Sequence, residues 1–166
     1  GGPADSTERA LELVDDAVAR GLDVTFDIHT REHGITNLSC ALPDYEQAMS
    51  ADDRRSNLSS RSYRASVRQH VSIISSFGIG GWENVSIFTA PSTPEFEGVT
   101  LAQLSEADPF SAICDVLAAN ADDLNAVMVL CHSYREEEIV GAAAHPLCMV
   151  GSDATALATD GPIGES

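Results

Sequence analysis

Two kinds of hydrophobic spacing follow one another at the start of the chain. Between residues 10 and 18 apolar residues recur at helical spacing; Asp5 or Ser6 can cap that helix, and Gly21 can end it in a left-handed conformation. From Leu22 to Ile28 apolar and polar residues alternate strictly. The pattern predicts a helix followed by a strand with one face against helices and one polar face.

The middle of the chain is more polar. Residues 29–34 predict a polar loop at the carboxyl end of the first strand, and the Ser- and Arg-rich residues 44–70 predict an exposed helical segment. Short apolar runs at 71–77 and 85–90 predict strands on either side of a turn at 78–81.

Helix-start signals mark three places in the second half: the capping boxes Thr100-x-x-Gln103 and Ser133-x-x-Glu136, and Asp108 before a proline. The helix after Asp108 is predicted to bury one apolar face, made by Phe110, Ile113, Cys114 and Leu117. The helix after Ser133 is predicted to point four residues inward: Ile139, Val140, Ala143 and Ala144. Residues 126–131 predict a buried strand.

The last apolar run ends in a carboxylate. Leu147 to Val150 predict a strand buried on both faces, and a Gly-Ser turn then leads to Asp153. A (β/α) barrel displays its catalytic groups at this end of a strand, so Asp153 could transfer a proton or contact a metal. The alternative is an Asp that only caps the next turn.

The order of helices and strands predicts an α/β fold. With 166 residues the chain can bury one sizeable core, whereas a complete eight-stranded barrel takes roughly 250 residues. The chain begins Gly-Gly-Pro-Ala without an initiator Met and ends without a closing element. We therefore expect a piece of a larger protein rather than a complete small domain.

Charge narrows the function. The formal net charge is −17, and all nine basic residues are Arg. An acidic surface repels nucleic acid and anionic membranes, so we expect neither as a partner. The absence of Lys also excludes a Walker lysine or a Schiff-base lysine from this stretch.

Six of the nine Arg lie between residues 31 and 70: Arg31, Arg54, Arg55, Arg61, Arg64 and Arg68. The group at 54–68 is predicted to be a solvated helical surface, and the alternative is a lid that recruits a carboxylate-bearing ligand.

The four cysteines, at 40, 114, 131 and 148, show no C-x-x-C spacing and are predicted to be buried free thiols of a reducing compartment. The sequence has no run of 18 apolar residues and no visible signal peptide, so we expect a cytoplasmic protein.

Several segments in consistent order carry a resemblance to a known family: Leu22–Arg31, Leu38–Pro43, Trp82–Val85, Glu97-Gly98 before Thr100, Asp108–Phe110 and His145–Thr155. Together they resemble the N-acyl-D-amino-acid deacylases of the amidohydrolase superfamily. The resemblance implies a fragment of a (β/α)8 TIM barrel that hydrolyses the amide bond of N-acyl-D-amino acids with zinc.

This resemblance implies that residues 1–166 form a partial barrel domain with the following parts. Residues 22–28 are its seventh strand, residues 147–152 its eighth, and residues 31 to about 125 contain an inserted lid. Asp153 then matches the general acid/base beside the metal and is a possible metal ligand. The family's main zinc ligands lie on earlier strands, so none of the five His is assigned to zinc. The chain departs from the family's Asp-x-Tyr-Pro-Tyr run, having Asp27-Ile-His-Thr-Arg31.

The chemistry fits these positions. A carboxylate at Asp153 can take a proton from the attacking water and pass it to the leaving amine. The substrate's carboxylate needs a cation, and the Arg31 fork can bind it bidentately. His29 is predicted to hydrogen-bond the substrate or to orient a neighbouring residue, the alternative being a loop histidine that caps backbone groups.

The other candidates have plainer interpretations. His33 and His132 favour structural packing, with a role beside the site as the alternative for His132. His145 is predicted in the last turn of a helix, where a cation complements the helix dipole. Asp27 either lines the site or pairs with an Arg.

Two other functions stay open. One is a different amidohydrolase, such as a dihydroorotase-like or hydantoinase-like ring opener, which would keep Asp153 and need other substrate contacts. The other is a non-catalytic binding module. The sequence flanking this segment would separate them, because the deacylase prediction requires an upstream His-x-His and Cys.

Overall fold

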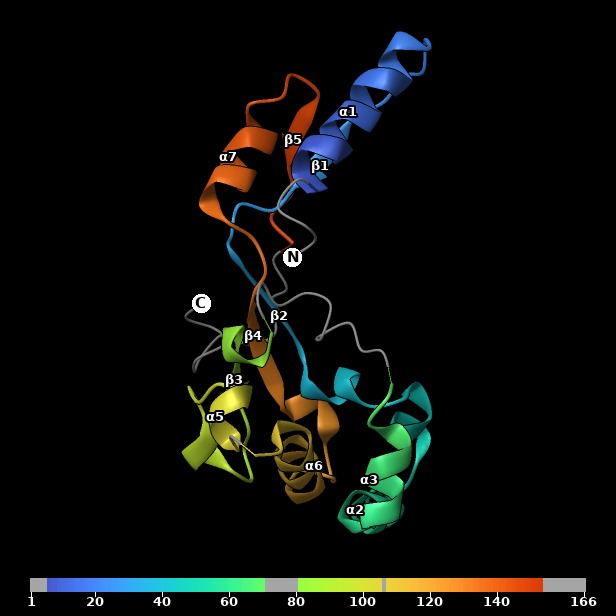
Figure 1. Cartoon of the computed structure of the whole chain (residues 1–166), viewed down its shortest axis with the longest axis vertical. Helices are drawn as coiled ribbons and strands as arrows, with labels where there is room; N and C mark the ends of the chain where they lie inside the picture. The colour runs from blue at the N-terminus through green and yellow to red at the C-terminus, as the bar shows by residue number, and fades with distance from the viewer. Residues whose placement is uncertain (1–5, 71–80, 106, 154–166) are drawn as a thin grey trace. The chain divides into compact units, whose positions relative to one another are not determined.

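The chain divides into two compact units, each described by itself. The computed structural model describes residues 6–70, 81–105 and 107–153 (Figure 1). The 32–134 unit comprises Glu32–Tyr134, and the terminal unit comprises the flanking segments up to Arg31 and from Arg135 onward. The chain passes between the units twice, and both passages leave the 32–134 unit at one place, since the backbone N–H groups of Ser133 and Tyr134 both donate to the carbonyl of Glu32, at 2.9 and 3.1 Å.

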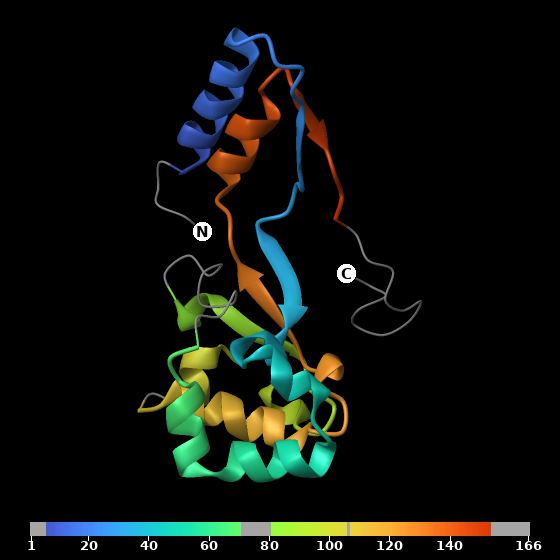
Figure 2. The ribbon, with the colours of Figure 1, turned by 90° about the vertical axis from the view of Figure 1, so that its right-hand side faces the viewer.

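The terminal unit consists of two helix-strand pairs, which are α1 (Ser6–Ala19), β1 (Phe26–Ile28), α7 (Glu136–Ala143) and β5 (Cys148–Val150). The strands pair in parallel, and Figures 1 and 2 show α1 and α7 side by side. Gly21 ends the first helical segment with φ +80°, as predicted. Its N–H donates to Val18 and that of Leu22 to Ala17, which is a Schellman ending.

Fewer apolar side chains are buried in the terminal unit than the sequence predicted. On α1 the half-buried positions are Leu11, Val14 and Ala17, whereas Leu13 is 70% exposed. The prediction that β5 is buried on both faces is wrong: Val150 is also 70% exposed. A strand is covered on both faces only between two layers, and in the described chain β5 has β1 as its single strand neighbour.

The predicted face of α7 is wrong as well. Val140, Ala143 and Ala144 are exposed, whereas Ala142 is buried and Ile139 is half-buried. The helix also starts later than predicted.

Arg135, rather than Ser133, is the N-cap of α7, with its N–H donating to the Glu138 carboxylate at 3.0 Å. The Ser133 hydroxyl donates to the Cys131 carbonyl at 3.2 Å, and Ser133 lies two residues before the observed N-cap.

The 32–134 unit contains an antiparallel sheet in the order β2-β4-β3, formed by β2 (His33–Asn37), β3 (Val85–Thr89) and β4 (Met128–His132). The strands predicted at 85–90 and 126–131 are confirmed. The polar loop predicted at 29–34 ends too late, because His33 and Gly34 already belong to β2, where they pair with His132 and Cys131 of β4. The predicted strand at 71–77 lies outside the described residues.

Short helices connect and follow the strands of this unit, and their bounds are η1 Leu38–Ala41, η2 Asp44–Ala48, α2 Ala51–Ser59, α3 Arg61–Val67, η3 Trp82–Asn84, η4 Pro94–Phe96, α5 Leu101–Leu104, α6 Pro109–Ala119 and η5 Leu124–Ala126. The Thr100–Gln103 capping box and the Asp108 cap are present as predicted. The side chains of Ser50 and Ser60 cap α2 and α3.

The core of the 32–134 unit is continuous from sheet to helices. Its fully buried side chains include Leu38, Leu58, Ile87, Leu101, Ile113, Leu117, Val127 and Val129. The predicted apolar face of α6 is confirmed, and α6 packs on α2 (Figure 2). Cys114 and Cys131 are buried as predicted, and burial raises the pKa of each thiol to about 11. Cys40 and Cys148 are only partly buried.

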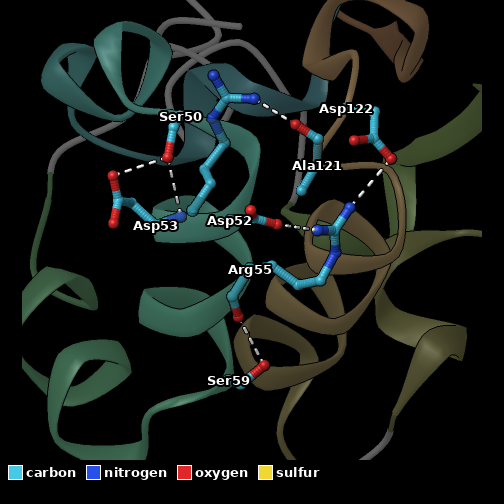
Figure 3. A network of polar contacts seen from close by, with 8 residues as sticks. Ser50, Asp52, Asp53, Arg55, Ser59, Ala121 and Asp122 are labelled. Atoms are coloured by element: carbon cyan, nitrogen blue, oxygen red, sulfur yellow. Dashed lines mark hydrogen bonds and ion pairs between the residues drawn. The ribbon is translucent and has the colours of Figure 1, made fainter.

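Residues 44–70 are helical, as predicted, but they are not simply an exposed segment. Leu58 and Val67 are buried because they belong to the same core. Glu46 is fully buried, and Arg54 is 9% exposed. Arg55, its neighbour on α2, pairs instead with Asp52 and Asp122, both at 3.0 Å (Figure 3).

The fold is thus mixed α/β, with one parallel strand pair and one antiparallel sheet. The described strands do not form a closed barrel. The segment expected to contain a lid, residues 31 to about 125, overlaps the 32–134 unit, and its role as a lid stays a prediction. Within the described part of the chain, every helix is too short or too polar to span a lipid bilayer.

Candidate active site at the ends of β1 and β5

The carboxyl ends of β1 and β5 lie at the same edge because the two strands are parallel and in register. Ile28 pairs with Val150, and the Gly151 N–H extends the ladder by donating to the Ile28 carbonyl at 2.9 Å. The segments that follow these strands carry His29, Arg31 and Asp153, the three residues predicted for the site. The structure therefore brings together two stretches more than 100 residues apart in sequence.

Arg31 links the two stretches directly. Its Nη2 donates to the main-chain carbonyls of Ser152 and Asp153, at 3.1 Å each. In the described residues Nε and Nη1 of Arg31 have no acceptor, and the side chain is exposed. The guanidinium thus holds the backbone at Asp153 and retains donors for an anion.

Asp153 itself lies at a turn in the left-handed region. Its φ is +46°, the single non-glycine residue of the described chain with positive φ. Asp tolerates this region better than most residues because its short side chain can hydrogen-bond locally. The residue is exposed, as a group that exchanges protons with a substrate must be.

His29 follows β1 and is half-buried. Its Nδ1 accepts a hydrogen bond from the backbone N–H of Arg31 at 3.3 Å. This is the backbone-capping interaction that the sequence allowed as an alternative. A hydrogen bond accepted at Nδ1 places the proton of the neutral ring on Nε2.

The Asp27 side chain lies beside Gly151. A Cβ built at Gly151 would lie 3.3 Å from the Asp27 Cγ and closer still to Oδ2. The carboxylate of β1 therefore occupies the space that a side chain on residue 151 would need. Among the described residues, Arg31 donates to main-chain carbonyls and not to the Asp27 carboxylate.

The described residues contain no group of three or more His, Cys, Asp and Glu that could hold a metal ion. The ring of His132 stacks on that of His33 with a centroid distance of 4.9 Å, and its Nε2 is 4.0 Å from a Glu32 oxygen. His145 Nε2 lies 3.1 Å from Asp15 Oδ1. These three His therefore have structural contacts.

A second polar cluster was not singled out as a site from the sequence. Arg61, Arg64 and Arg68 line an open pocket of about 400 Å³ in the 32–134 unit, although they were predicted to be part of a solvated surface. The available signal was their spacing of three and four residues along one predicted helix. The prediction that Arg54, in the same group, lies on the surface is wrong, because Arg54 is buried.

No protein-family model matches this chain, and no curated protein matches it. Among solved structures, it is similar to the N-acyl-D-glutamate deacylase of Bordetella bronchiseptica, crystallised with zinc and a phosphonate mimic of the tetrahedral intermediate. The identity is 21% and the TM-score 0.47. The likeness covers 89% of this chain and 23% of that one, so this chain spans less than a quarter of that protein's length.

Proposed function

We propose that this chain is part of a metal-dependent amidohydrolase that hydrolyses the amide bond of N-acyl-D-amino acids, with Asp153 as its general acid/base. The single observation that supports the proposal most is the Arg31 bridge, which holds the turn at Asp153 against the segment after β1. The residues that carry the family resemblance, Leu22–Arg31 and His145–Thr155, include both sides of this bridge.

Asp153 has the chemistry that amide hydrolysis requires. A carboxylate near the scissile bond takes a proton from the attacking water, and the same group then protonates the leaving amine. Zinc would supply a Lewis acid when bound. The described residues offer no group that fits it, so its ligands would have to come from other residues.

Arg31 and His29 are proposed to contact the substrate. The remaining donors of Arg31, Nε and Nη1, suit the α-carboxylate that every N-acyl amino acid carries. The His29 ring lies beside Arg31, because its Nδ1 accepts a hydrogen bond from the Arg31 backbone N–H.

The test uses the complete protein that contains this chain, assayed with zinc on N-acetyl-D-amino acids and, in parallel, on a hydantoin. Asp153→Asn should lower kcat by roughly a hundredfold or more with little change in stability, the scale of a general acid/base. Asp16→Asn, an exposed change on α1 of the same unit, is the matched control. Near-normal kcat in Asp153→Asn would refute the assignment, and turnover of the hydantoin alone would favour a ring-opening amidohydrolase.

Arg31→Lys tests the carboxylate contact. Lysine keeps the charge and loses the fork, so KM for the acid substrate should rise about ten- to a hundredfold, the equivalent of about 1.5–3 kcal/mol for a hydrogen bond to a charged group. KM for a substrate whose carboxylate is replaced by an amide should not change. An equal loss for acid and amide would mean that Arg31 acts only by holding the backbone at Asp153.

A further inference from the structure

The pocket of the 32–134 unit has an unusual charge for this protein. The chain carries a formal net charge of −17 with nine basic residues in total, and three of those nine line this one pocket. Its lining consists of Ser59, Arg61, Arg64, Ala65, Arg68, Asp108 and Ser111. The spacing of Arg61, Arg64 and Arg68 at i, i+3 and i+7 puts them on one face of α3.

Arg64 is the structural member of the three. Its Nη1 donates to the Ser111 carbonyl at 3.1 Å, its Nε donates to the Leu58 carbonyl, and Nη2 pairs with Asp115. Only 16% of its side chain is exposed. Arg64 thus docks α3 on α6, and these contacts occupy each of its three nitrogens.

Arg68 uses only part of its hydrogen-bonding capacity within the described residues. Its Nη2 lies 2.6 Å from Asp108 Oδ2, and its guanidinium carbon is 5.2 Å from the centre of the Phe110 ring. Hydrogen bonds from Arg68 and Ser111 hold the pKa of Asp108 well below its usual range, so this carboxylate stays ionised. Nε and Nη1 of Arg68 have no acceptor among the residues that the structure describes.

Arg61 is the third guanidinium group in the pocket lining. It is exposed, and within the described ranges it makes no hydrogen bond or ion pair. The pocket and its immediate partners therefore place three guanidinium groups against two carboxylates, those of Asp108 and Asp115. The pocket therefore has an excess of one positive charge, although the chain as a whole has a negative net charge.

We infer that this pocket binds a small oxyanion, a phosphate or a carboxylate group, between the guanidinium groups of Arg61 and Arg68. Both groups are planar forks that match such oxygens bidentately. Arg61 begins α3 and Arg68 is its C-cap residue, so their Cα atoms are seven residues apart, about 10 Å along the helix axis, a gap that two Arg side chains can close from either end. Arg64 fixes the helix that carries them. The site lies wholly in the 32–134 unit and does not depend on the role of Asp153.

The test is calorimetric titration of the 166-residue chain with inorganic phosphate and, separately, with succinate, at ionic strength held constant with chloride. We expect saturable one-to-one binding of at least one of the two. Binding of phosphate alone, succinate alone or both supports the site and identifies the ligand class. Saturation by neither overturns it.

Two variants locate the site. Arg61→Gln should weaken binding at least tenfold, and it should not disturb folding, because Arg61 has no partner in the described chain. Arg55→Gln is the matched control, since it removes the same charge from a partly exposed position of α2 outside the pocket lining. If both variants weaken binding equally, or if Arg61→Gln leaves it unchanged, the proposed site is refuted.

Discussion

Arg54 is predicted to be the most important single side chain for the stability of the 32–134 unit. Its Nε donates to the Glu46 carbonyl at 3.0 Å and its Nη2 to the Met49 carbonyl at 2.6 Å, while Nη1 donates to the Ala121 carbonyl. A longer contact, 3.4 Å, reaches the Gln47 carbonyl. One buried cation thus ties α2 to the turn before it and to the segment after α6.

The expected loss follows from these three contacts. Arg54→Met keeps the apolar stem and removes the donors, so the Met49 and Ala121 carbonyls lose this partner, whereas the Glu46 carbonyl still accepts from the Met49 N–H. A buried acceptor that loses its donor costs about 1–3 kcal/mol, and part of this is offset because a buried guanidinium no longer has to be desolvated. We therefore expect a loss of about 3–5 kcal/mol. With a urea m-value of about 1.5–2 kcal/mol/M, the unfolding midpoint should fall by about 2 M.

The assay is urea unfolding followed by the fluorescence of Trp82, which is the only tryptophan and packs on the core of the 32–134 unit. The control is Arg55→Met, one residue along α2, whose ion pairs to Asp52 and Asp122 involve side chains 97% and 82% exposed (Figure 3). Such pairs contribute about 0–1 kcal/mol.

If Arg54→Met does not fold, Arg54→Lys, which keeps the charge and some donors, should fold with an intermediate loss. Arg54→Met within 1 kcal/mol of the wild type, or no worse than Arg55→Met, would show that the carbonyl contacts are not what stabilises this unit.

Three further predictions concern buried charge, thiols and glycines. Burial raises the pKa of the Glu46 carboxyl above its ordinary value of 4.5, against the opposing charge of Arg54; its contribution to stability is therefore fully present below pH 4.5 and lost as pH rises through the raised pKa. Glu46→Met should stabilise by about 1–3 kcal/mol at pH 7, and its advantage over the wild type should shrink in urea melts near pH 4.5; a constant gap contradicts this. Iodoacetamide at pH 8 should label Cys148 in the native chain, and it should label Cys114 roughly a hundredfold more slowly because burial raises the pKa of Cys114 to about 11. Peptide mass spectrometry can measure both labelling rates, and equal rates would contradict the burial of Cys114. Gly21→Ala, at φ +80°, should cost about 1 kcal/mol in thermal melts followed by circular dichroism, whereas Gly141→Ala, inside α7 with nothing within 4 Å of the added Cβ, should gain about 0.5–1 kcal/mol; the same sign for both would be contrary to expectation.

Local patterns predicted the elements whose determinants are close together in sequence. The Asp108 cap, the apolar face of α6 and the Gly21 ending all depend on residues within two helical turns of one another. Capping and helical periodicity act over that distance, so the sequence alone contains the information.

The errors share a different cause, because they depend on distant partners. Arg54 looked like a surface residue, and one of the carbonyls that satisfy its buried guanidinium, that of Ala121, is 67 residues away in sequence. His33 reads as loop until β4 supplies the strand with which it pairs. Val140 faces solvent because the layer packed on α7 contacts the other side of the helix, where Ala142 is buried.

The candidate site was predictable in its members but not in its contacts. Residues after the ends of two parallel strands must share an edge, so the nearness of Arg31 and Asp153 could be expected once both strands were identified. The sequence gives no sign that the guanidinium reaches backbone carbonyls rather than a carboxylate. Nor does it show that the Asp27 side chain occupies the space beside Gly151.

The single carbonyl of Glu32 that accepts from both Ser133 and Tyr134 has a consequence for the order of folding. Without it, pairing β1 with β5 would close a loop of about 100 residues, at an entropic cost of about 4 kcal/mol. When the 32–134 unit is folded, the two ends of that loop are already hydrogen-bonded neighbours, and only a few residues on each side remain to be ordered. The strands that carry Arg31 and Asp153 therefore come together at low entropic cost only after the intervening unit has folded, which makes assembly of the candidate site the late step.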